Sequence, residues 1–115
     1  MITRFPGLTP TRSRAVEHDG LILTVAVAPD PVTPSMYEQS AKALARIDES
    51  LKLCGSDKSK ILSAIVYISD MAQKAAMNEA WLAWIDRKNP PTRACVAVEL
   101  GSPTTLVEIV VTAAK

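Results

Sequence analysis

The sequence predicts an α+β fold in which two helices pack on one face of a mixed six-stranded β-sheet. Three observations lead to this prediction. Short apolar and β-branched runs bounded by Gly, Pro or Asp recur along the 115 residues, as is typical of strands. Two longer segments carry apolar residues at helical spacing instead. These segments follow one another as strands, helix, strand, helix and two strands, so we expect a single domain over residues 1–115.

The N-terminal third is predicted to be strands. Met1–Phe5 is short enough for an edge strand, and Arg12–Asp19 is a polar second strand. Asp19-Gly20, followed at once by an apolar run, is a strong signal for a tight hairpin turn. The run Leu21–Ala28 ends before prolines and is apolar on both of its alternating sides, which predicts a central strand.

The first helix begins near Thr33-Pro34-Ser35. Ser35 with Glu38 could form a capping box, or Thr33 could cap the helix with Pro34 in its first turn. Gly55 provides a C-terminal stop. The predicted apolar stripe has spacings of three and four residues: Tyr37, Ala41, Leu44, Ile47 and Leu51.

A strand and a second helix follow. Ile61–Ser69 has the composition of a strand, and Asp70 with Gln73 resembles the start of a helix. Trp81 and Trp84 lie at helical spacing in that helix. Two tryptophans could form a ligand cage, but this spacing favours core packing or a subunit contact.

The last two predicted strands carry the conspicuous charges. Pro90 and Pro91 block helix, and alternation from Arg93 onward places Arg93 and Cys95 on one side of a strand. After a Gly-Ser-Pro turn, the apolar run Leu106–Ala113 is interrupted only by Glu108. A carboxylate in such surroundings is costly unless it is paired, protonated or facing a wet cavity.

Composition excludes several classes of function. A net charge of +1 gives no electrostatic case for nucleic acid or an anionic membrane. No apolar run approaches transmembrane length and no signal-peptide core is visible, so we expect a cytoplasmic protein. Cys54 and Cys95 lack metal-binding or redox spacing and are expected to be free thiols. His18 is the only histidine, so no metal-ligand cluster is expected.

The covering of the sheet points to an oligomer. Two helices can cover only one face, yet Leu21–Ala28 and Leu106–Ala113 are apolar on both faces. We therefore expect other copies of the chain to cover the second face.

The motifs TRACVAVEL and LVEI, separated by a Gly/Pro turn, resemble the C-terminal signature of the RidA (YjgF) family. The segments HDGLILTVAV and NEAWLAW are similar to a divergent bacterial branch of that family, so the resemblance covers essentially the whole chain. Members hydrolyse reactive enamines and imines of 2-oxo acids without a cofactor. The resemblance also implies a chorismate-mutase-like fold and a homotrimer whose ligand clefts lie between subunits.

The same resemblance implies roles for individual residues. Arg93 would hold the substrate carboxylate, in place of being a surface or glutamate-paired arginine. Cys95 would contribute to binding mainly through its backbone, because no base lies near it in sequence for thiol catalysis. Glu108 would orient or activate the hydrolytic water, the alternative being a structural salt bridge.

Two positions depart from the family pattern. The hydroxyl-bearing aromatic residue of the N-terminal loop corresponds to Arg12, or to Ser13 or Arg14, and the serine of the central strand corresponds to Val25. Arg12 and Val25 are thus predicted to line the substrate pocket with altered chemistry. The predicted function is a 2-imino acid and enamine deaminase of the 2-iminobutanoate/2-iminopropanoate type. The alternative is a non-catalytic trimer that binds a small carboxylate metabolite or a protein partner.

Overall fold

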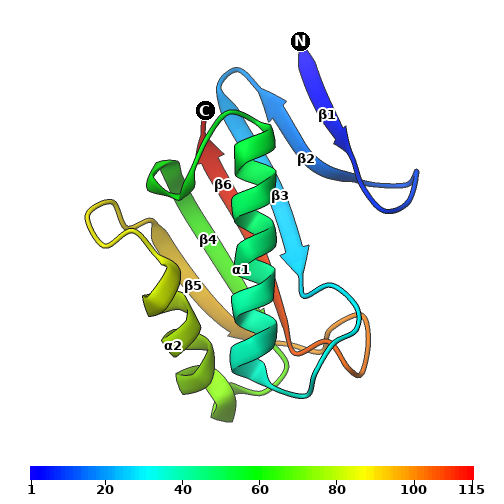
Figure 1. Cartoon of the computed structure of the whole chain (residues 1–115), viewed down its shortest axis with the longest axis vertical. Coiled ribbons are helices and arrows are strands. Elements are labelled where there is room, and N and C mark those ends of the chain that lie inside the picture. Colours follow the sequence, from blue (N-terminus) through cyan, green and yellow to red (C-terminus); the bar gives the residue numbers. More distant parts are fainter.

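A computed structural model describes residues 1–115 as one mixed sheet with two helices on the same face (Figure 1). The six strands are β1 (Ile2–Pro6), β2 (Ser13–His18), β3 (Leu21–Val27), β4 (Ile61–Ile68), β5 (Thr92–Ala97) and β6 (Val107–Ala114). The helices are α1 (Met36–Leu53) and α2 (Lys74–Trp84), with short 3₁₀ turns at η1 (Lys58–Lys60) and η2 (Met71–Gln73). The predicted α+β architecture is therefore confirmed.

The strands lie side by side in the order β1-β2-β3-β6-β4-β5. All neighbours are antiparallel except β4 and β5, which are parallel because α2 lies in the connection between them. β3 is internal, as its apolar sequence predicted, and β1 and β5 form the two edges of the sheet.

The β2–β3 hairpin uses the predicted Asp19-Gly20 turn. His18 pairs with Leu21, which leaves Asp19 and Gly20 as the two turn residues with φ of 51° and 79°. Positive φ at both positions matches the right-handed twist of the flanking strands. Glycine, having no Cβ, adopts this conformation at little cost.

Helix α1 begins at Ser35, as one of the two predicted alternatives has it, but the second half of the predicted capping box is not formed. Ser35 is the N-cap, and its hydroxyl accepts a hydrogen bond from the Glu38 amide at 3.1 Å. The Glu38 carboxylate accepts from the Thr33 hydroxyl at 2.6 Å, so Thr33 supports the cap without being the cap residue. This satisfies one of the backbone donors that a helix start leaves unpaired.

The first half of the predicted α1 stripe is wrong. Tyr37 and Ala41 are exposed, whereas Gln39 is buried. The Gln39 side-chain amide donates to the carbonyls of Thr33 and Thr104, at 2.7 and 2.9 Å, and accepts from the amide of Leu106 at 2.9 Å. A polar residue takes the buried position because all of its hydrogen bonds are made there.

Helix α2 is fastened to the core by its tryptophans. Trp81 is buried, and Trp84 is half-buried with its indole nitrogen donating to the Asp48 carboxylate of α1 at 2.8 Å. The two rings are 5.6 Å apart. Core packing, and not a ligand cage, is what this pair provides. Neither α1 nor α2 is long and apolar enough to cross a membrane.

The face of the sheet opposite the helices is apolar and uncovered in one chain. Along β6 the odd-numbered residues from Val107 to Ala113 are buried under the helix layer, so the even-numbered residues face the other way. On that second face Leu21, Leu23 and Val25 of β3 are 43–53% exposed. Exposed apolar rows of this kind mark surfaces that bind another molecule.

Candidate functional site

Three of the five predicted site residues line one cavity. Glu108 of β6 pairs with Val27 of β3 and with Tyr67 of β4, and its side chain points to the uncovered face. Next to it, β3 extends beyond the start of β2, which leaves a hollow of about 310 Å³ between the end of β3 and the loop before β2. We call this hollow the loop pocket. Its lining is Pro6, Gly7, Leu8, Arg12, Ser13, Arg14, Val25, Ala26, Val27, Arg46 and Glu108.

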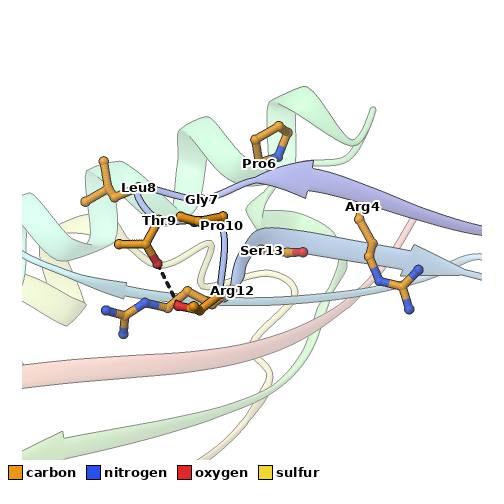
Figure 2. A pocket seen from close by; sticks show the side chains of 9 residues that line it. Arg4, Pro6, Gly7, Leu8, Thr9, Pro10, Arg12 and Ser13 are labelled. Atoms are coloured by element: carbon orange, nitrogen blue, oxygen red, sulfur yellow. Dashed lines mark hydrogen bonds between the residues drawn. The ribbon is translucent and has the colours of Figure 1, made fainter.

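A larger cavity of about 690 Å³ lies within the same loop (Figure 2), and Glu108 is not among its lining residues. It is lined by Arg4 and residues 6–13, and the guanidinium groups of Arg4 and Arg12 point to opposite ends of it. The Thr9 and Thr11 hydroxyls form a 2.8 Å hydrogen bond across the loop tip. No carboxylate lines this cavity, so the smaller loop pocket is the better candidate for acid–base chemistry.

The two arms of the loop come close together at Gly7 and Arg12, a point that we call the neck. A Cβ atom at Gly7 would lie 2.5 Å from the Arg12 carbonyl oxygen, so only glycine lets the two arms of the loop approach this closely. The neck holds Arg12 and Ser13 beside the end of β3. The sequence left the substituted loop position open among Arg12, Ser13 and Arg14, and all three line the loop pocket.

The three arginines of the loop pocket are in different electrostatic states. Arg14 donates to the Glu49 carboxylate and to the Ser50 hydroxyl of α1, both at 2.8 Å, so its charge is paired. Arg12 is exposed and Arg46 is half-buried, and neither forms a salt bridge. Arg46 was not predicted, because from the sequence it is one of several charges on the polar side of α1. Only the packing of α1 over the end of β3 reveals its position.

Arg93 lies in a different environment, held by helix α2. Its guanidinium stacks over the Trp81 ring at 5.2 Å from the ring centre, and one of its nitrogens donates to the side-chain amide oxygen (Oδ1) of Asn78 at 2.8 Å. The same nitrogen is 3.8 Å from the Met77 sulfur. We call Arg93 with Met77, Asn78 and Trp81 the anchor cluster. None of its partners is a carboxylate, so a half-buried cation is oriented but not neutralised.

One copy of the chain does not bring Arg93 and Glu108 together. Arg93 pairs with Ala64, which is buried under the helices, so Arg93 faces the helix layer. Cys95 lies on the same side as Arg93, as predicted, and is half-buried against the core. Glu108 faces away from the helices, and β4 separates its strand from β5. The loop pocket and the anchor cluster are therefore two separate regions within one subunit.

The Cys54 thiol is not placed as a nucleophile. Burial raises the pKa of the Cys54 thiol above its ordinary value of 9.0, and the nearby Glu17 carboxylate raises it further. Both effects disfavour the reactive thiolate. Cys95 and Cys54 are unpaired thiols, and no group of three His, Cys, Asp or Glu side chains is placed to share a metal ion.

Comparison with known proteins agrees with this fold. A family model described as Endoribonuclease L-PSP matches residues 11–115, and curated relatives are RutC family proteins. The chain belongs to the YjgF/RutC family. A RutC family protein of Haemophilus ducreyi is 37% identical over 99% of this chain and 97% of its own length. The RutC family protein YoaB of Escherichia coli is 38% identical over 89% of each chain.

Solved structures give the same assignment for the fold. The crystal structure of a YjgF family member from Neisseria meningitidis has a TM-score of 0.93 and 41% identity, covering 100% of this chain and 95% of that one. The resemblance seen in the sequence is thus confirmed for the YjgF/RutC family, and the mixed sheet with two helices is the fold of this family.

Proposed function

We propose that this YjgF/RutC family protein hydrolyses reactive 2-imino and enamine acids to 2-oxo acids and ammonia. The observation that carries the proposal is the anchor cluster. Arg93 has a fixed orientation, neutral partners and a free positive charge, which together suit bidentate binding of a substrate carboxylate. No carboxylate of the chain is in salt-bridge contact with Arg93.

Glu108 is proposed to act on water. It makes no salt bridge or side-chain hydrogen bond within the chain, and it borders a cavity, so its oxygens are available to a solvent molecule. In the proposed reaction, water adds to the imine carbon while Glu108 takes one of its protons. Glu108 passes that proton to the nitrogen, and the hydroxyl of the tetrahedral intermediate gives up its own proton to the nitrogen through Glu108 as the carbon–nitrogen bond breaks. Ammonia leaves, and the oxygen that came from water becomes the carbonyl oxygen. An enamine first takes a proton on carbon to become the imine.

A complete site is proposed to need more than one copy of the chain. Arg93 and Glu108 lie on opposite sides of one sheet, while the uncovered apolar face and the edge strand β5 are free to meet another copy. We propose a homotrimer in which Arg93 and the Cys95 backbone of one subunit face Glu108, Arg12 and Val25 of its neighbour. The two free thiols fit a reducing compartment, so we place this reaction in the cytoplasm.

A second candidate is a non-catalytic trimer that binds a small carboxylate or a protein partner. It is favoured by Val25, an apolar side chain beside Glu108 where a hydroxyl would help to position water. Ser13 is the hydroxyl that the loop pocket does contain. An endoribonuclease, the activity in the description of the family model, is not favoured, because the single histidine, His18, is exposed and pairs with Asp19.

Ammonia release from freshly generated 2-iminopropanoate tests the proposal. An amino-acid oxidase would make the imine in place, catalase would remove peroxide, and semicarbazide trapping would report how long the imine survives. We expect faster imine loss with the wild-type protein than with buffer or with Arg93→Ala. If the wild type binds 2-oxobutanoate but accelerates no imine, the non-catalytic candidate is correct.

A further inference from the structure

The loop pocket contains more positive charge than the proposed reaction requires. Its ionisable lining is Arg12, Arg14, Arg46 and Glu108. The Arg14 guanidinium forms a salt bridge with the Glu49 carboxylate at 2.8 Å. The lining then has two unpaired cations, Arg12 and Arg46, and one carboxylate, that of Glu108. A substrate carboxylate held by Arg93 would not reduce this excess, because Arg93 is an additional cation from outside the loop pocket.

Arg46 is the more informative of the two unpaired cations. It lies in the interior of α1, is half-buried, and has no carboxylate in salt-bridge contact, although Glu49 is one turn further along the helix. Glu49 is instead occupied by Arg14. A partly desolvated guanidinium with no anion is unfavourable, and a bound anion would relieve that cost. The chain therefore supplies no anion to pair with Arg46, and a bound ligand could supply one.

The rest of the lining suits a short carbon chain. The edge of β3 at Val25–Val27 forms an apolar wall of the pocket: Val25 and Val27 lie on the face of Glu108, with Val27 its direct neighbour in the sheet, and Ala26 lies on the helix face. Arg12 and Arg46 belong to the other elements bordering this wall, the loop and α1. A cavity of about 310 Å³ is at the small end of ligand sites, so it fits a compact molecule better than a nucleotide.

We propose that the loop pocket selects substrates with a second anionic group, namely 2-imino acids whose side chain ends in a carboxylate. The inference rests on the proposed function, the hydrolysis of the imine group of the substrate. Arg93 of a neighbouring subunit would bind the carboxylate next to the imine carbon, the Val25–Val27 wall would contact the methylene groups, and Arg12 with Arg46 would bind the distal carboxylate. Two guanidinium groups can provide up to four donors to one planar anion. The reaction is otherwise unchanged: imine and water give the 2-oxo dicarboxylate and ammonia.

A pair of substrates with the same carbon chain tests this selectivity. 2-Iminoglutarate and 2-iminopentanoate would be generated from glutamate and norvaline by oxidases, and kcat/KM would be measured for the wild type, Arg12→Gln, Arg46→Gln and Arg87→Gln. Arg87 is an exposed arginine outside the loop pocket, so Arg87→Gln is a control for the loss of one positive charge. We expect the wild type to favour the dicarboxylate by about tenfold or more, as for a charge-assisted hydrogen bond. In Arg12→Gln and Arg46→Gln this ratio should fall toward one, and in Arg87→Gln it should not change.

Measuring binding in place of turnover tests the inference independently of the proposed activity. Calorimetric titration with 2-oxoglutarate and 2-oxopentanoate measures the second-anion contact even in a protein that turns over no imine. Tighter binding of the dicarboxylate that depends on Arg46 supports the inference in either case. Equal affinity for both acids, or a preference that survives Arg12→Gln and Arg46→Gln, overturns it while leaving any observed imine hydrolysis intact. A stronger preference for a phosphate-bearing 2-oxo acid would replace the dicarboxylate with a different anion and overturn the substrate class.

Discussion

Arg93 of the anchor cluster and Arg12 of the loop pocket are held in opposite ways. Arg93 is fixed by an aromatic ring, an amide and a sulfur, all supplied by one turn-and-a-half of α2, and its position is set before any ligand arrives. Arg12 comes from an irregular loop, is exposed and makes no side-chain contact of this kind. Because the Arg93 side chain is already ordered, binding an anion to it costs little conformational entropy. The Arg12 side chain must become ordered as the anion binds, so most of that entropy is lost in the binding step.

This difference separates two tasks. A group common to all substrates, the carboxylate beside the imine, is best met by a rigid donor on regular secondary structure. A group that differs between substrates can be met by a loop whose residues vary with little effect on the sheet. The contrast between the two regions can be tested by variants that change the side chains of one region while leaving those of the other intact.

The largest effect is expected for Arg93→Ala. Removing the oriented cation should weaken 2-oxo acid binding roughly 100-fold or more, because a charge-assisted bidentate contact is lost in a partly dry site. Calorimetric titration with 2-oxobutanoate measures the change, with Arg87→Ala as the control. Arg93→Lys should restore little of the binding, since a lysine cannot reproduce the planar fork. Unchanged affinity in Arg93→Ala would show that the anchor lies elsewhere.

Glu108→Gln should act on turnover more than on affinity. The amide keeps the size of the carboxylate but cannot take a proton from water, so kcat should fall by about 100-fold with KM nearly constant. Steady-state kinetics on 2-iminopropanoate provides both values. Sedimentation of the same variant is the control. A loss of the oligomer would mean that Glu108 forms a structural ion pair between subunits instead.

Asn78→Asp is expected to neutralise the positive charge of the anchor cluster. The new carboxylate would lie 2.8 Å from the Arg93 guanidinium, where the amide oxygen is now, and would neutralise the charge that the substrate needs. We expect about tenfold weaker 2-oxo acid binding with no loss of thermal stability. Asn78→Ala is the matched variant, since it removes the contact without adding a charge. Stronger binding in Asn78→Asp than in Asn78→Ala would contradict the role proposed for the free charge.

The smallest effect is expected for Gly7→Ala at the neck of the loop. The added methyl group would meet the Arg12 carbonyl oxygen at 2.5 Å, so the loop must shift, at a cost of about 1 kcal/mol in unfolding free energy. Gly101→Ala is the control, because a Cβ there meets no atom within 4 Å. Denaturant unfolding measures both variants. Equal stability of the two would show that the neck opens without strain.

The sequence predicted the fold well because its periodicities are local. Alternation, helical spacing and the Asp19-Gly20 turn each depend on a few neighbouring residues, and the strands, the two helices and the turn lie in the predicted segments. The error in α1 arose where burial depends on distant partners. Gln39 is buried because Thr104 and Leu106, more than sixty positions away, complete its hydrogen bonds, and no helical count from the sequence includes them.

The candidate site was predictable in part for the same reason. Alternation correctly placed Arg93 and Cys95 on one side of a strand, but it could not say that Glu108 faces the opposite side of the sheet. Arg46 was missed because its polar neighbours in α1 look alike in sequence, and only the end of β3 beneath it distinguishes one from another. Arg14, by contrast, lines the loop pocket but has its charge paired, a distinction that depends on Glu49 of α1.

The neck formed by Gly7 and Arg12 has a consequence for how this protein can change over time. Because the two arms of the loop already touch at that point, residues 8–11 form a closed segment between them. Exchanges within this segment would leave Arg12 in place beside the end of β3, so the segment can change while the charge of the loop pocket is kept. The reactive machinery would be inherited unchanged, and the diversity of a lineage would accumulate in the loop.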